Sequence, residues 1–474
     1  MHDLTRYTAT ELAHLIRSKK ASPVEVAEAH LNRIEELNPK LNAVVTLAPN
    51  VLEQARRAEQ LLMKNALVGV LHGVPITIKD TIETAGLRST SGCPSRAQFV
   101  PEHDAPSVLR LKAAGAIILG KTNMAEMAMD YTSENPLFPP ANNPYDLTRT
   151  PGGSSGGEAA AISTCMSPAG LGSDLAGSVR IPAHFCGIAG LKPTTGRVLG
   201  GGQFPPAIGP YSLGAVIGPM ARCMADLGLI FNVLTGSETA IGSITGCRVA
   251  WYTDDGVTPV TDETKQAVER AALALKNAGL ITQQCRPPAV KRGHELWLKL
   301  FSRASVVQLR DVYTGSEDQA GAFVRWRLAT ADDTPVPALD EYIRVWMERD
   351  RLRLALIDWM NDVPLLLAPV GAVPAIKHGE HKVVVGDRAM STFRAFSHCQ
   401  TFNTFDLPAV CVPAGMSTEG LPIGVQIVGR PNEEETVLSA AAIVEETLGG
   451  CRPPPVDYPQ ITQITQIRQN SSDK

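Results

Sequence analysis

Helix-like and strand-like segments alternate along almost the whole chain. Ser22-Pro23-Val24-Glu25 is a capping box with proline at the first helical position, and apolar residues follow at helical spacing to about residue 37. Short apolar runs at residues 44–47 and 74–79 predict strands. The alternation continues through helix-like residues 51–64, 106–114, 263–277 and 434–446 and strand-like residues 116–119, 248–251, 365–368, 410–413 and 423–428. This order predicts an α/β fold in which helices cover both faces of a sheet.

The zone from residue 295 to residue 360 is the least strand-like part of the chain. Alternating charges predict helices packed over the sheet, and the zone contains four of the five tryptophans, Trp297, Trp326, Trp346 and Trp359. These rings either wall a pocket or fill a core, and the second role is the commoner one for any single tryptophan. Residues 198–209, with a glycine run and paired prolines, are predicted to form a loop at the pocket mouth.

The net charge and the cysteine content limit which binding partners and which cellular compartment are expected for this chain. A net charge of -4 and a pI near 6.2 argue against nucleic-acid binding, which normally requires a basic face. Nine cysteines without C-x-x-C spacing favour free thiols in a reducing compartment, so we expect a cytoplasmic protein. No run approaches the ~18 apolar residues of a membrane helix, and the polar N-terminus has no signal core.

Residues 152–178 place two serines in glycine-rich turns. Gly152-Gly153-Ser154-Ser155-Gly156 matches the G-x-S-x-G nucleophile elbow, which would make Ser154 the nucleophile. However, an elbow follows an apolar strand, and residues 146–151 are polar and end in proline. A phosphate-binding loop is also disfavoured, because no Gly-Lys-Ser/Thr follows the glycines.

Ser178 lies in a better setting for a nucleophile. A small-residue segment at 168–172 can form a strand, and residues 178–186 can turn into a helix. Unpaired N–H groups and the positive end of a helix dipole at such a position stabilise a developing negative charge. The alternative for Ser178 alone is an ordinary N-cap serine.

Lys79 is the candidate for the base. It ends the apolar run at 74–79, and burial there would lower its pKa and make the neutral amine available. The alternative is a lysine that marks the strand end with its ammonium in solvent. His184, six residues after Ser178, is predicted to be a packed residue, because Ile181, Phe185 and Cys186 surround it in the sequence.

Together these segments resemble the amidase signature family, whose members hydrolyse or transfer amide groups with a Ser-Ser-Lys triad. The matching segments are residues 72–80, 152–161 and 173–193, with further similarity at 121–126, 218–222 and 421–431. The resemblance extends from about residue 10 to residue 447. It implies a single large domain, residues 1–451, with a central twisted mixed β-sheet covered by helices on both faces. Its parts would be N-terminal helices (1–65), a catalytic core (66–235), a variable helical pocket region (239–399) and C-terminal strands and helix (400–451), followed by a flexible tail (452–474).

The resemblance also implies roles for individual residues. Ser178 would attack the substrate carbonyl, Ser154 would relay its proton, and Lys79 would be the terminal base. Ser154 lies 24 residues before Ser178, as the family pattern requires. The Gly153-Ser154 peptide would be cis, no metal or cofactor would be needed, and an oxyanion would be held by the backbone N–H groups of Leu175, Ala176, Gly177 and Ser178.

Three further sites follow from the resemblance and its departures. Ala176 replaces the usual glycine, so a conformation with positive φ is less accessible there. Met129, Asp130 and Tyr131 correspond to the substrate-facing loop, and for Asp130 an exposed loop charge is preferred over a pocket carboxylate. Asp174 and Arg180 are predicted to form a structural pair that braces the nucleophile loop, with substrate binding by Arg180 as the alternative.

The substrate class is the least determined expectation. The family includes amidases, esterases and carbamate-cleaving enzymes, so a small amide, anilide, carbamate or ester is expected, and a homodimer is the assembly considered. One branch is the A subunit of the glutamyl-tRNA amidotransferase, but its Ser-Ser-Leu-Asp-Gln-Ile-Gly-Pro run is replaced here by Gly-Ala-Val-Ile-Gly-Pro at 214–219. A stand-alone amidase is therefore preferred. The alternatives are the glutamine-hydrolysing component of an amidotransferase complex or a degenerate scaffold protein.

Overall fold

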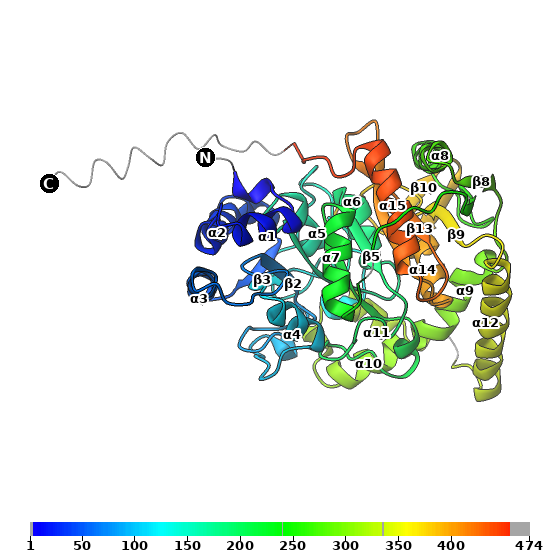
Figure 1. The fold of residues 1–474 in the computed structure, drawn as a ribbon. Helices are drawn as coiled ribbons and strands as arrows, with labels where there is room; N and C mark the ends of the chain where they lie inside the picture. The colour runs from blue at the N-terminus through cyan, green and yellow to red at the C-terminus, as the bar shows by residue number, and fades with distance from the viewer. Residues whose placement is uncertain (1–2, 239, 334–335, 456–474) are drawn as a thin grey trace.

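A single mixed sheet of eleven strands forms the centre of the molecule. The computed structural model of the protein describes residues 3–238, 240–333 and 336–455 (Figure 1). The strand order is β1 (Val44–Leu47), β3 (Ile117–Thr122), β2 (Pro75–Lys79), β4 (Ala169–Asp174), β6 (Val216–Ala221), β5 (Ala189–Lys192), β12 (Ala409–Met416), β13 (Pro422–Val428), β9 (Leu365–Pro369), β7 (Arg248–Trp251) and β8 (Ile281–Gln284). β2 pairs in parallel with β3 and β4, and β7 pairs in parallel with β8 and β9; the other neighbours are antiparallel.

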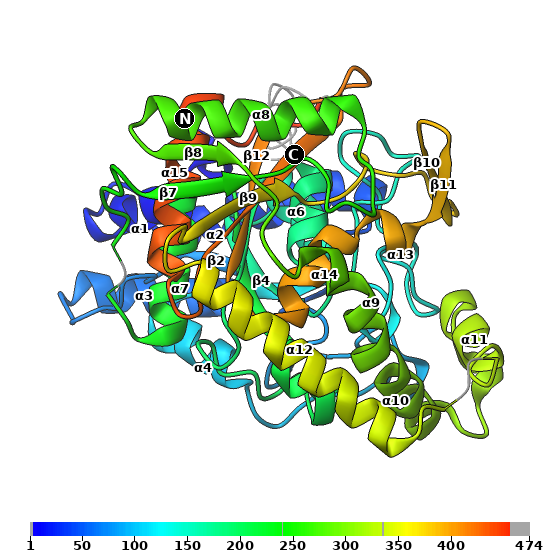
Figure 2. The same ribbon diagram turned by 90° about the vertical axis from the view of Figure 1, so that its right-hand side faces the viewer.

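Helices cover both faces of this sheet. They are α1 (Ala9–Arg17), α2 (Pro23–Leu41), α3 (Val51–Met63), α4 (Pro106–Ala113), α5 (Gly156–Ser163), α6 (Arg180–Cys186), α7 (Met224–Thr235), α8 (Asp262–Asn277), α9 (Gly293–Trp297), α10 (Arg303–Tyr313), α11 (Ala322–Ala329), α12 (Leu339–Trp359), α13 (Thr392–Ala395), α14 (Ser397–Thr404) and α15 (Glu434–Leu448). A separate hairpin, β10 (Lys382–Val385) and β11 (Arg388–Ser391), projects beside α13 (Figure 2).

The side-chain period of β9 shows how two cores form. Leu365 and Leu367 pack in a core with residues of α8 and α15, whereas Leu366 and Ala368 pack in a second core with residues of α6, α12 and α14. Successive strand side chains point to opposite faces, so an entirely apolar strand needs a helical layer on each side. The predicted single α/β domain with a mixed sheet is confirmed.

Local sequence signals account for most of the element boundaries. Ser22 Oγ accepts from the N–H of Val24 at 3.0 Å, and Glu25 accepts from the N–H of Ser22 at 2.9 Å, so the predicted capping box begins α2. The strand expected at 116–119 continues to Thr122. It can do so because Lys121 and Thr122, although polar, have buried hydrogen-bond partners that compensate for their desolvation.

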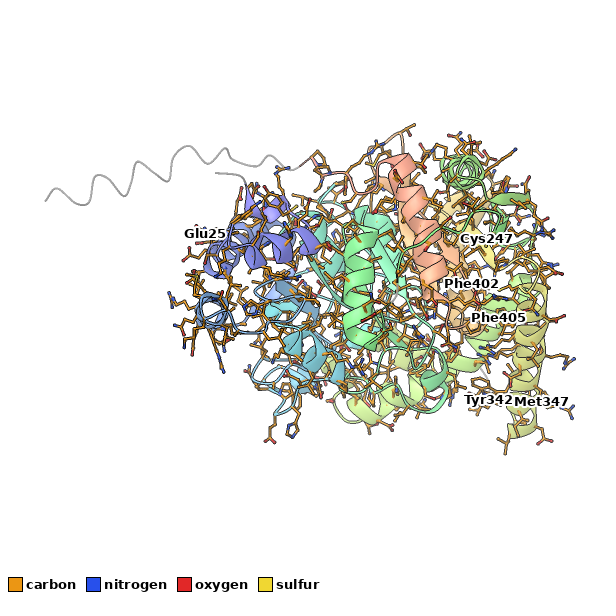
Figure 3. All side chains as sticks on the ribbon, in the orientation of Figure 1. Glu25, Cys247, Tyr342, Met347, Phe402 and Phe405 are labelled. Atoms are coloured by element: carbon orange, nitrogen blue, oxygen red, sulfur yellow. The ribbon has the colours of Figure 1, made fainter. Side chains whose placement is uncertain are left out.

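The described residues between 295 and 360 form helices joined by turns and contain no strand, as predicted. Phe402, on α14, and Phe405, directly after α14, are buried in the core that also contains residues of α12 and of the sheet, and Met347, on α12, is 62% exposed (Figure 3). The finer division of the domain stays a prediction, and residues 456–474 of the expected tail lie outside the described residues. Among the described helices, none combines the length and the hydropathy that a bilayer crossing requires.

The two-layer packing predicts a large difference between two isoleucines of the same sheet. Ile427, on β13, is 0% exposed, and Ile281, on the edge strand β8, is 55% exposed. Ile427→Ala should lower the free energy of unfolding by about 2–5 kcal/mol, because it removes buried methyl groups and leaves a cavity. Ile281→Ala should change it by less than about 0.5 kcal/mol. Urea unfolding followed by circular dichroism measures both, and equal losses would contradict the assignment of β13 to the core.

Candidate active site

Lys79 ends β2 with its side chain fully buried. Thr77 and Lys79 face the same side of the strand, toward α5 and the turn before it. The Lys79 Nζ lies 2.5 Å from Ser154 Oγ and 2.9 Å from Ser173 Oγ, within hydrogen-bond distance of both. Burial lowers the pKa of Lys79 to about 7, against the attraction of Asp174 and Glu158, which raises it. A large fraction of the amine is therefore neutral near neutral pH.

Ser154 lies in a tight turn directly before α5. The Gly153-Ser154 peptide is cis, in agreement with the expectation from the resemblance. A Cβ on Gly153 would come within 2.2 Å of the Thr132 carbonyl oxygen, so only glycine fits there. No strand precedes this turn among residues 146–153, and the nucleophile-elbow interpretation therefore fails.

Ser178 follows β4 and precedes α6, which begins at Arg180. It is 6% exposed, and it lines the same cavity as Ser154. The carbonyl of Ser178 accepts from the N–H of Ser155 at 3.2 Å, which ties the two serine turns together. Ser178 is not the N-cap of α6, because Val179 occupies that position, so the ordinary capping role is excluded.

Asp174 and Arg180 form a fully buried ion pair beneath the Ser178 turn. Arg180 donates to both carboxylate oxygens, at 3.0 and 3.1 Å, as predicted for a bracing pair. Its remaining donors contact Gln426, Asn403 and the Cys399 carbonyl. Burial raises the pKa of Asp174, but the attraction and hydrogen bonds of Arg180 outweigh this and hold it well below its usual range.

The loop expected to hold an oxyanion follows one expectation and departs from another. The positive φ falls on Gly177, at +111°, and Ala176 is not among the described residues with positive φ, so its methyl group is accommodated. The N–H of Gly177 is donated to Asp174 Oδ1 at 2.9 Å, which occupies one of the four expected donors. The carbonyls of Ala176 and Leu175 accept from Tyr131 and Trp297, and this fixes the orientation of the loop.

A cavity of about 740 Å³ opens onto both serines. Met129, Asp130 and Tyr131 line it, and so do residues of the 198–209 loop. Asp130 is half-buried, so the preferred prediction of an exposed loop charge was wrong; burial raises its pKa. Aromatic side chains supply much of the remaining wall, namely Tyr211, Trp297, Phe323, Trp326 and Phe393.

Sequence reasoning missed two polar residues around Lys79. Ser173, which contacts Lys79 directly, stands at the end of a strand-like segment, and that position was the available signal. Glu158 lies one helical turn after Ser154, fully buried, and accepts hydrogen bonds from Thr77 and Thr122. Burial raises the pKa of Glu158 to about 7, against these hydrogen bonds. A glutamate within an alanine-rich helix was its signal in the sequence.

His184 takes no part in this cluster. It is fully buried, accepts from the N–H of Gly424 at 2.7 Å and lies 3.0 Å from the Val373 carbonyl, so the packed role predicted for it is confirmed. Within residues 3–238, 240–333 and 336–455, no group of three His, Cys, Asp or Glu side chains has a metal-binding arrangement.

The buried ion pair predicts an asymmetric response to mutation. Arg180→Met should lower the free energy of unfolding by about 3–5 kcal/mol, because Asp174 keeps a buried charge without its partner. Adding Asp174→Asn should recover part of that loss. Lys265→Met breaks the exposed pair with Asp262 and should lower the free energy of unfolding far less, because water and salt screen that pair. Urea unfolding measures these three variants, the single variant Asp174→Asn and the wild type. A double variant whose loss of stability equals the sum of the two single losses would contradict the pairing.

Comparison with known proteins places this cluster in a family. Residues 25–438 match the family model described as Amidase. The chain is 31% identical to the A subunit of the glutamyl-tRNA(Gln) amidotransferase from Sulfurihydrogenibium sp. (93% of this chain, 96% of that protein) and 30% identical to human fatty-acid amide hydrolase 2 (93% and 88%). It is also similar to the structure of 6-aminohexanoate cyclic dimer hydrolase, with a TM-score of 0.84, 29% identity and coverage of 96% and 99%. The chain therefore belongs to the amidase family and is an enzyme that hydrolyses carbon–nitrogen bonds.

Proposed function

We propose that this protein is a stand-alone amidase that hydrolyses a carboxylic amide through an acyl-enzyme on Ser178. The contact between Lys79 Nζ and Ser154 Oγ, at 2.5 Å in a fully buried setting, is the observation that carries this proposal. A lysine with a pKa near 7 is a competent general base, and a serine within its reach can relay a proton.

The reaction would proceed in two halves. Ser178 Oγ attacks the amide carbon while its proton passes to Ser154 and the Ser154 proton passes to Lys79. The N–H groups of Leu175, Ala176 and Ser178 stabilise the oxyanion, and one such donor is worth about 2.7–4 kcal/mol. Lys79 then returns the proton through Ser154 to the departing nitrogen, and the C–N bond breaks. Water hydrolyses the Ser178 ester by the same relay and restores the free enzyme.

The shape and lining of the cavity support an aryl or otherwise apolar amide as the substrate. A volume of about 740 Å³ with several aromatic walls suits a bulky acyl or amine group better than a small polar one. Anilides, carbamates and esters would use the same acyl-enzyme chemistry and remain within the proposal. Similarity to proteins named fatty-acid amide hydrolase and aryl acylamidase supports the same choice.

Glutamine hydrolysis within an amidotransferase complex is the second candidate, because proteins named as the A subunit of such a complex are similar at 31% identity over almost the whole chain. A degenerate scaffold protein is disfavoured by the intact contact between Lys79 and Ser154. A cytoplasmic location and a homodimer stay predictions; the nine free cysteines agree with a reducing compartment.

Removal of any member of the Lys79–Ser154–Ser178 relay should abolish hydrolysis of an acyl anilide. Ser178→Ala, Ser154→Ala and Lys79→Met should each lower kcat by about 10⁴-fold or more. Ser155→Ala is the matched control, because its hydroxyl contacts the backbone of Ser173, and it should retain activity within about tenfold. The rate of aniline release gives kcat for each protein, and hydrolysis of glutamine is assayed in parallel.

A covalent serine probe tests which serine is the nucleophile. A fluorophosphonate should label Ser178, and label on Ser154 instead would overturn the assignment of the nucleophile.

The pH dependence should report the buried lysine. Lys79 must be neutral to accept a proton, so kcat/KM should fall by about tenfold per pH unit on the acid side of a pKa near 7. Steady-state rates on an anilide between pH 5 and pH 9 measure the limb, and circular dichroism at each pH verifies that the protein stays folded. A profile that stays flat down to pH 5 would contradict the proposal, because no group with a pKa near 7 would then have to lose its proton.

A further inference from the structure

The lining of the cavity contains one carboxylate that the proposed reaction does not use. Asp130, Asp174 and Arg327 are the lining side chains, among the described residues, that carry a formal charge at neutral pH. Asp174 is committed to Arg180 and to the N–H groups of Gly177 and Val179. Arg327 donates to Ser302 in another part of the wall. Asp130 therefore stands apart from both.

Asp130 has no cationic partner within ion-pair distance in the described part of the chain. Its oxygens accept from the N–H of Tyr131 at 2.7 Å and from Thr132 Oγ1 at 3.0 Å. A carboxylate offers about four acceptor positions, so two are left for other donors. Burial raises the pKa of Asp130, and the charge of Glu134 raises it further. Hydrogen bonds from Tyr131 and Thr132 lower this pKa, and so does the nearby His381. A cation bound in the cavity would supply the ion-pair contact that Asp130 lacks among the described residues.

Aromatic rings line the same cavity as Asp130, and Tyr131 is its neighbour in the sequence. The ring of Tyr131 stacks on Phe393 with 4.7 Å between centroids. Phe393 also lies 6.4 Å from Phe323 and 5.8 Å from Trp297, and all four rings line the cavity. Aromatic faces attract ammonium groups, and a neighbouring carboxylate strengthens that attraction. The combination of one carboxylate and several rings is the chemistry of an ammonium subsite.

The subsite lies next to the reacting groups. A Cβ on Gly153 would come within 2.7 Å of the Asp130 carbonyl oxygen, and Gly153 is bonded to Ser154. Asp130 and Ser178 line the same cavity. The backbone of Asp130 therefore lies beside the residue that precedes Ser154, in the cavity that also exposes Ser178.

We propose that Asp130 and the rings of Tyr131 and Phe393 form a subsite for a protonated amine, so that the enzyme prefers amides carrying an ammonium group near the scissile bond. The subsite belongs to the cavity of the proposed amidase reaction and rests on that proposal for its role in catalysis. Its ligand chemistry, however, can be measured without turnover.

Direct binding to the folded Ser178→Ala protein tests the subsite. Isothermal titration calorimetry at pH 8 compares 4-phenylbutylammonium with 4-phenylbutan-1-ol, which has the same shape and no charge. We expect the ammonium ion to bind at least about tenfold more tightly, which is the scale of one charge-assisted hydrogen bond. Asp130→Asn should remove this preference, and Asp130→Glu should retain part of it.

Glu134→Gln is the matched control. Glu134 lies four residues further along the same loop, is 42% exposed, contacts His378 and is not part of the cavity lining. Its loss should leave the preference unchanged, which separates a local contact from a general negative potential. The inference is overturned if both ligands bind equally, if neither binds, if the preference survives in Asp130→Asn, or if Glu134→Gln abolishes it.

Turnover separates failure of the subsite from failure of the proposed function. The active enzyme is assayed on the p-nitroanilides of 6-aminohexanoic acid and of hexanoic acid. The amidase proposal is supported if either anilide is hydrolysed by the active enzyme and not by Ser178→Ala, and this outcome does not depend on the role of Asp130. The subsite is supported if the KM of the amino substrate is at least about tenfold lower than that of the neutral substrate, and if Asp130→Asn raises it to the value of the neutral substrate.

Discussion

The buried guanidinium of Arg180 is the interaction on which the active-site architecture depends. It connects Asp174 at the end of β4 with Gln426 on β13 and with Asn403 on α14, so one side chain joins strands and a helix that are more than 200 residues apart. A buried charge must be neutralised and hydrogen-bonded by its surroundings. This requirement holds the turn that carries Ser178 in one position relative to the sheet, and it positions the amides of that turn.

The proposed chemistry depends on the burial of a second basic side chain. Lys79 reaches the interior because β2 is the strand between β3 and β4, with α5 packed over its end. The hydroxyls of Ser154 and Ser173 solvate the amine poorly compared with water, so its pKa falls toward neutrality. Asp174 and Glu158 are near enough to limit that fall. The sheet that buries Lys79 also brings the hydroxyls of Ser154 and Ser173 into contact with its amine.

Much of this could be predicted from the sequence, and the misses have a common cause. The spacing of apolar residues and the helix-capping residues predicted the helices and strands, because these signals are local. The capping box at Ser22 is one example. The lysine at the end of an apolar strand and the serines in glycine-rich turns were recognisable as residue types that chemistry needs. Asp130 was misjudged as an exposed loop charge, and the amide of Gly177 was not expected to bond Asp174. Both depend on which chain segment covers a loop, and neither leaves a local signal.

The α/β class, the family resemblance and the candidates Lys79, Ser154 and Ser178 could all be read from the sequence, since each rests on patterns within a few residues or on fixed spacing. The folded chain was needed to show that Lys79 is fully buried against Ser154, that the positive φ falls on Gly177 rather than Ala176, and that Asp130 lines a cavity walled by rings from distant helices. Burial, and with it the pKa and the hydrogen-bond demand of a side chain, is set by contacts between segments far apart in the chain.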